Sequence, residues 1–151
     1  MKKKIIIGLV FFLIGIGLSI CLESSLRSNV LSSYQWTTND GIQFVGKNFF
    51  LFTSPIYYLG FGISFSIMAI DCLSKSVKQV IIIGTIGFLI FVFATIGLSA
   101  LDANSKIIEC TACNNGIRKL RYNEVNHGLI LGISIILSGI PSVIRLLKIK
   151  K

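Results

Sequence analysis

The sequence contains few charged residues. Only 14% of its 151 residues are Asp, Glu, Lys or Arg, whereas 53% are apolar. A soluble domain of this size does not need so much apolar surface to fill its core. The shortage of charge therefore excludes an ordinary water-soluble protein, and it indicates that lipid surrounds much of the chain.

Four long stretches contain no charged residue at all, namely 5–22, 48–70, 79–101 and 125–144. At about 1.5 Å of helical rise per residue, each reaches about 27–35 Å, which matches a hydrocarbon core of about 30 Å. Backbone amides cannot stay unpaired in lipid, and these stretches are too long and too uniformly apolar for barrel strands. Helices are therefore expected.

We expect a single-domain, all-α integral membrane protein, a four-transmembrane-helix bundle over residues 1–151. We expect the spans at about 5–22, 49–71, 79–101 and 128–147, and the outer loops at 23–48 and 102–127.

The basic residues predict the orientation of the bundle. Nine of the fifteen Lys and Arg residues lie at the two termini and in the short turn after the second span, and six lie in the two long loops. Positive residues are retained on the cytoplasmic side. We therefore expect both termini and the turn that begins at Asp71 to face the cytoplasm, and the protein to lie in a bacterial inner (plasma) membrane. Positive residues next to membrane ends fix topology and contact anionic lipid, so no nucleic-acid partner is expected.

The first span has an alternative interpretation as a signal sequence. Three lysines precede an apolar run that ends in Leu18-Ser19-Ile20-Cys21, which resembles the lipobox of bacterial lipoproteins. A small residue is expected immediately before the lipidated cysteine, and Ile20 is bulky. The sequence therefore favours an uncleaved first span; in the alternative, Cys21 carries a lipid anchor and three spans remain.

Proline is also scarce, and one of the two prolines marks a helix start. Ser54-Pro55 has the form of an N-cap followed by a first helical residue, so the second span either begins there or is one kinked helix over 49–71. Pro141, near the end of the last span, is a milder case of the same feature.

Small residues recur at four-residue spacing within the spans. Gly60 pairs with Ser64 in this way, and Gly128 pairs with Gly132. Such faces let two helices approach closely, which is the main source of packing energy in lipid. We expect these residues to pack helices within the bundle, with a dimer interface as the alternative.

The outer loops contain the clearest local patterns. Around the Asn39-Asp40-Gly41 turn, residues 33–38 and 42–45 have the composition of a β-hairpin. Residues 106–110 and 117–122 indicate a second hairpin. We expect the two hairpins to pair into a small sheet over the bundle. This cap is where contacts with lipid headgroups or an acidic partner are expected, through Trp36, Arg118, Lys119 and Arg121.

The chain has four cysteines, and only Cys110 and Cys113 form a motif. By the predicted topology this CxxC pair lies on the oxidising side, where a structural disulfide is expected and a redox-active pair is the alternative. A thiol oxidoreductase needs a second exchanging pair, and Cys21 is the only other outer cysteine. For a metal, His127 is the only further ligand candidate, so we expect no metal site and no cofactor.

These patterns favour a non-enzymatic function. The predicted spans contain no charged residue at bilayer depth, and such residues usually mark ion and proton paths. The leading hypothesis is an accessory protein that binds another membrane or extracytoplasmic protein through its outer loops. The alternatives are a membrane thiol-disulfide oxidoreductase that uses Cys110 and Cys113, and a small channel or transporter.

The predicted orientation can be tested by cysteine labelling. In single-cysteine variants on intact cells, we expect a membrane-impermeant maleimide to label Cys110 and Cys113. Both are predicted to face the outside of the cell, where the reagent can reach them. Cys72 serves as the control and should react only after the membrane is made permeable. Labelling of Cys110 that also requires permeabilised cells would reverse the predicted orientation.

Overall fold

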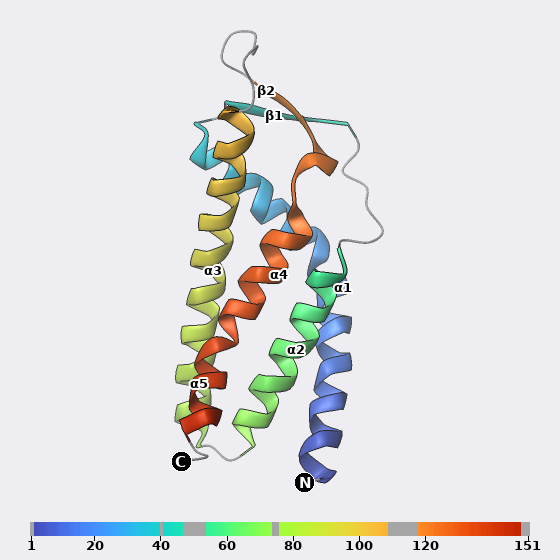
Figure 1. The fold of residues 1–151 in the computed structure, drawn as a ribbon, viewed down its shortest axis with the longest axis vertical. Helices are drawn as coiled ribbons and strands as arrows, with labels where there is room; N and C mark the ends of the chain where they lie inside the picture. The colour runs from blue at the N-terminus through green and yellow to red at the C-terminus, as the bar shows by residue number, and fades with distance from the viewer. Residues whose placement is uncertain (1, 40, 47–53, 74–75, 109–117, 149–151) are drawn as a thin grey trace.

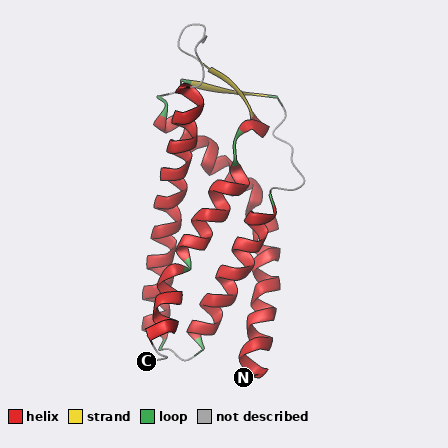
Figure 2. Cartoon of the chain, viewed as in Figure 1, coloured by secondary structure: helices red, strands yellow, loops and turns green. Residues whose placement is uncertain are grey.

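The computed structural model describes residues 2–39, 41–46, 54–73, 76–108 and 118–148. Most of them are helical, and the long helices run alongside one another (Figures 1 and 2). The start of α1 and the end of α5 lie at one end of the molecule, and two short strands lie at the other, which we call the sheet end. The elements in chain order are α1 (Lys2–Thr37), β1 (Ile42–Val45), α2 (Pro55–Cys72), α3 (Val77–Ile108), β2 (Arg118–Arg121), the 3-10 turn η2 (Tyr122–Glu124), α4 (His127–Ser138) and α5 (Ile140–Lys148).

Four helical segments are long and apolar enough to cross a membrane: Lys4–Thr37, Pro55–Cys72, Val77–Lys106 and His127–Leu147. Large apolar side chains such as Leu13, Phe88 and Phe93 are exposed on the outside of the bundle. In water this exposure would be unfavourable by about 25 cal/mol per Å², whereas acyl chains solvate it well. The structure therefore indicates a multi-pass membrane protein.

Helices α1 and α3 are longer than a bilayer requires. Their 36 and 32 residues correspond to about 54 Å and 48 Å, against a hydrocarbon core of about 30 Å. The charge-free stretches end at Leu22 and Leu101, so both helices continue beyond them at the sheet end. Figure 1 shows the second half of α1 turning toward this end of α3.

The predicted hairpins are not confirmed. Residues 33–37, expected as a strand, form the last turns of α1. The burial of Val30 and Tyr34, four residues apart, follows the helical period, and Ser32 and Gln35 are exposed. Asn39 then takes a positive φ of 48°, which ends the helix, and the Gly41 N–H donates to the Thr38 carbonyl over 2.9 Å.

In the second loop, residues 106–108 are also helical rather than extended, since they form the last turn of α3. Residues 109–117 lie outside the described part of the chain.

The small sheet contains one strand from each loop. β1 and β2 are parallel, with Ile42 opposite Arg118 and Val45 opposite Arg121. Each strand connects one long helix to the next, β1 between α1 and α2 and β2 between α3 and α4. The two strands are therefore not joined by a tight turn, and they pair in parallel across the end of the bundle (Figure 1).

Prolines mark helix boundaries at two places. Pro55 is the first residue of α2, with Ser54 as an extended N-cap; residues 49–53, the start of the kinked-helix alternative, lie outside the described residues. The last span, expected as one helix over 128–147, is divided at Gly139 into α4 and α5. Pro141 has no N–H to donate, so the ladder is interrupted there, and the Gly139 N–H donates to the Ile136 carbonyl over 3.1 Å.

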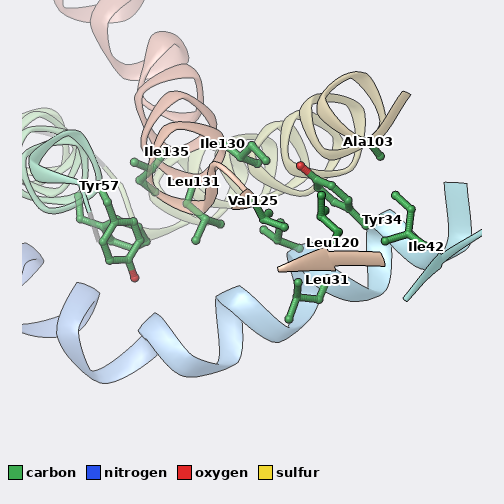
Figure 3. Close-up of a cluster of buried hydrophobic side chains, with 12 residues drawn as sticks. Leu31, Tyr34, Ile42, Tyr57, Ala103, Leu120, Val125, Ile130, Leu131 and Ile135 are labelled. Carbon is green, nitrogen blue, oxygen red and sulfur yellow. The ribbon is translucent and has the colours of Figure 1, made fainter. Parts of the chain in front are cut away.

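The buried hydrophobic cluster lies in the half of the molecule toward the sheet end. It joins side chains from both strands and from α1, α2, α3 and α4, and Figure 3 shows how these side chains lie together. Tyr34 and Tyr57 are its largest fully buried members. The other labelled members are Leu31, Ile42, Ala103, Leu120, Val125, Ile130, Leu131 and Ile135.

The contact between α2 and α4 is made by small residues. A Cβ at Gly132 would lie 2.6 Å from Ile56 Cγ2 and 3.0 Å from the Ile56 carbonyl carbon, and one at Gly60 would lie 3.1 Å from the Gly132 carbonyl oxygen. Gly128 packs against Ser54 in the same way. Ser64 adds a hydrogen bond from its hydroxyl to the Ile135 carbonyl, at 2.8 Å. These four residues of the two expected pairs thus lie within the monomer, between two of its helices.

This contact generates a stability prediction. Gly132→Ala should destabilise the protein by about 1–3 kcal/mol, because the new methyl group meets backbone atoms of α2 that cannot move without shifting the helix. The measurement is the unfolding midpoint in mild detergent. Gly97→Ala is the matched control: a Cβ there meets nothing within 4 Å, so the change should be neutral or stabilising by up to about 1 kcal/mol. Equal midpoints for the two variants would contradict the tight contact.

Candidate functional site

At the sheet end, the described residues beyond the charge-free stretches, together with residues 125 and 126 before α4, form a folded unit, which we call the head. It comprises residues 23–39, 41–46, 102–108 and 118–126. Aromatic rings attach the sheet to the helices: Phe44 of β1 lies 5.6 Å from Tyr122, ring to ring, and 6.1 Å from Tyr34 of α1. The head thus has an apolar interior of its own.

One polar cluster connects α1 to α2. Glu23 and Arg27, one helical turn apart, form an ion pair at 3.5 Å and are only 8% and 7% exposed. The Tyr58 hydroxyl of α2 donates to Glu23 over 2.8 Å, and the Tyr57 hydroxyl donates to the Ser19 carbonyl over 2.7 Å. A buried ion pair is tolerated only when further hydrogen bonds compensate for lost hydration. The cluster therefore fixes α1 against α2 in one position.

A second polar cluster is centred on Asp102 of α3. Its carboxylate accepts hydrogen bonds from the Tyr34 hydroxyl of α1, from Lys106 Nζ at 2.6 Å and from Asn126 Nδ2 at 3.2 Å. These donors come from α1, from α3 itself and from the residue before α4. One carboxylate therefore joins three parts of the chain at the sheet end.

Neither of these two clusters is among the expected site residues. Glu23 and Arg27 fall in the expected outer loop 23–48, although their i, i+4 spacing is a helical signal that indicates a pair. Asp102 has the same i, i+4 spacing to Lys106, but no local signal indicates its bond to Tyr34, which is 68 residues away in the sequence. Only the tertiary fold brings the two together.

The sheet exposes two of the cationic residues expected to contact a partner. Lys119 and Arg121 of β2 are exposed, together with Gln43 and Val45 of β1, and these four residues form the outward face of the sheet. Arg118 lies on the opposite face and is half-buried, so it does not belong to this surface.

Trp36, in the last turn of α1, is 74% exposed. The side chain of the chain's single tryptophan is therefore available for contact at the sheet end, as part of α1 rather than of a strand.

The cysteine motif is not part of the described structure. Cys110 and Cys113 lie outside the described residues, so their disulfide and the redox alternative both stay predictions. Cys21, on α1, is exposed, and Cys72, the last residue of α2, is half-buried; both are free thiols. Within the described ranges, no group of three or more His, Cys, Asp and Glu residues is placed to hold a metal ion.

Asp71 is buried, which differs from its expected place in a solvent-facing turn. It lies in the last turn of α2 and has no exposed surface, and neither carboxylate oxygen has a hydrogen-bond partner in the described part of the chain. Asp71 lies seven residues after Ser64, which bonds to α4, so both residues occupy the same face of α2. That face points into the bundle and accounts for the burial.

Comparison of the chain with protein-family models, with curated proteins and with solved structures found no match. The class of protein therefore rests on the fold itself. Four membrane-length apolar helices indicate a multi-pass membrane protein, and the head lies at one end of the bundle.

The Asp102 cluster can be tested by local stability. Asp102→Ala should weaken the head by about 1–3 kcal/mol, because the buried Tyr34 hydroxyl and Lys106 lose their acceptor. We expect trypsin to cleave at Lys119 and Arg121 about tenfold faster or more, since cleavage follows local opening. Ser105→Ala is the control, because its exposed hydroxyl bonds only to its own helix. A cleavage rate unchanged by Asp102→Ala would contradict a holding role for this cluster.

Proposed function

We propose that this is a non-enzymatic membrane protein that binds an acidic segment of another membrane or extracytoplasmic protein through its head. In this proposal both termini and the turn between α2 and α3 are cytoplasmic, and the head lies outside the inner (plasma) membrane. The excess of Lys and Arg at the termini and in that turn supports the orientation.

The observation that carries the proposal is the two-faced sheet. One face packs Ile42, Phe44 and Leu120 against the helices, and the other exposes Gln43, Val45, Lys119 and Arg121. A surface fixed in this way before a partner arrives reduces the ordering cost of binding.

The distribution of charge in the head supports an acidic partner. Inside the head Glu23 pairs with Arg27 and Asp102 pairs with Lys106, so these four charges compensate one another. The exposed face of the sheet contributes two positive charges, at Lys119 and Arg121. Complementary charge across an interface increases both the association rate and specificity. An aromatic side chain as exposed as Trp36 is a frequent anchor in such interfaces.

Crosslinking in native membranes tests the proposal. A photoreactive amino acid at Gln43, on the exposed face of the sheet, should give a discrete adduct whose partner peptide is rich in Asp and Glu. The same probe at Ile82, on the exposed apolar surface of α3, is the positional control and should not give that adduct.

Charge variants then test the chemistry of the interface. Lys119→Glu with Arg121→Glu should reduce the adduct by roughly tenfold, because each exposed ion pair contributes up to about 1 kcal/mol. Lys119→Arg with Arg121→Lys should retain it. An adduct that survives charge reversal, or that forms equally from Ile82, would rule out recognition by this face.

A further inference from the structure

A pocket of about 310 Å³ lies between α1 and α3. Its described lining comes from these two helices alone and contains no charged side chain. None of the residues on the exposed face of the sheet lines it, so the pocket is separate from the surface discussed above. Its two walls differ in polarity.

The wall that α3 forms is mainly apolar and lies at membrane depth. Phe91, Val92 and Ile96 belong to it. They precede Leu101, where the charge-free stretch of α3 ends, by 5–10 residues, which corresponds to about 7–15 Å of helix. This side of the pocket therefore lies beside acyl chains.

The wall that α1 forms is mainly polar. Asn29, Ser32 and Ser33 line the pocket and come after Leu22, where the charge-free stretch of α1 ends. The second half of α1 turns toward α3 (Figure 1), and this turn brings polar residues from beyond one apolar stretch to the apolar side of another. A ligand with a polar end and an apolar chain satisfies both walls.

The hydrogen bonds of the hydroxyl groups specify the polar end. The Ser32 hydroxyl donates to the Ser28 carbonyl over 3.0 Å, and the Ser33 hydroxyl donates to the Asn29 carbonyl over 2.9 Å. On the other wall, the Thr95 hydroxyl donates to a carbonyl of its own helix over 2.8 Å. Each hydroxyl has only one proton, so these groups are left as acceptors. The pocket therefore suits a headgroup that donates hydrogen bonds.

The absence of charge from the described lining indicates that this headgroup is neutral. Arg27, the cation on this part of α1, lines a different pocket and is paired with Glu23. A charged headgroup would lose hydration here without gaining an ion pair, which is unfavourable. A hydroxyl group meets both conditions, because it donates a hydrogen bond and carries no charge. The volume is at the lower end of the range for small-ligand sites, which suits a headgroup and the first part of one chain.

We propose that this pocket binds a neutral membrane lipid that has a hydroxyl headgroup and one acyl chain, as in a monoacylglycerol. The headgroup hydroxyls donate to the polar wall of α1, and the chain runs along α3 into the bilayer. The proposal does not depend on the partner-binding function above.

Photocrosslinking of the full-length chain in phosphatidylcholine nanodiscs tests the proposal. The probe is a monoacylglycerol with a diazirine in its chain, and we expect its adducts to concentrate on residues 91–96. Unlabelled 1-oleoylglycerol should displace the probe at a concentration at least tenfold lower than two other competitors. Methyl oleate has the same chain without the hydroxyls, and lysophosphatidylglycerol has a charged headgroup.

Two outcomes of this experiment would overturn the proposal. One is labelling spread evenly over the exposed surface of α3, including Ile82, since that is ordinary solvation by lipid. The other is displacement by either competitor at the same concentration as by 1-oleoylglycerol, since the pocket would then not recognise a neutral hydroxyl headgroup.

Variants of α1 test the contacts of the headgroup. Asn29→Ala with Ser32→Ala removes two exposed polar side chains from the pocket wall and should reduce the adduct about tenfold. Gln35→Ala with Ser28→Ala is the matched control, because it removes an amide and a hydroxyl from the exposed surface of the same helix outside the pocket. The control should keep the adduct. Equal labelling of the two double variants would contradict a headgroup site at this wall.

Discussion

Backbone hydrogen bonding in an apolar solvent is the constraint on which this structure depends. Where the chain is free of charge, every N–H and C=O group must be paired inside its own segment, and only the helix achieves this for single spans. Once formed, a helix continues as long as its sequence allows. Helices α1 and α3 therefore extend beyond the charge-free stretches, and their extensions supply the frame on which the head is built.

Apolar and polar contacts have different roles in holding the head together. The apolar cluster provides most of the burial, but apolar packing alone does not specify one arrangement of helices. The Glu23–Arg27–Tyr58 and Asp102 clusters specify it, because each buried charge requires particular partners at particular distances. The exposed face of the sheet carries the positive charges of Lys119 and Arg121.

Sequence patterns that are compatible with one structure could be predicted, whereas patterns that are compatible with two structures could not. Length and hydropathy identify the four apolar helices, and Pro55 marks the start of α2. In contrast, Asn39-Asp40-Gly41 allows a positive φ, and that conformation can either close a hairpin or end a helix. The choice depends on the packing of Val30 and Tyr34, which involves residues distant in sequence. The parallel pairing of β1 with β2 is equally non-local.

The same limit applies to the sites. Lys119 and Arg121 stand out in the sequence by charge and alternation, whereas the Asp102 cluster depends on where α1, α3 and the start of α4 meet. The side chain of Asn126 connects the Asp102 cluster to the start of α4. When Asn126 turns its amide to Asp102, it completes the cluster that joins α1, α3 and α4, and it makes no cap bond to the first turn of α4. The Asn126 carbonyl instead accepts hydrogen bonds from the N–H groups of Leu129 and Ile130, over 3.1 Å and 3.0 Å. The start of α4 is therefore paired through the backbone of the residue whose side chain helps to hold the head together.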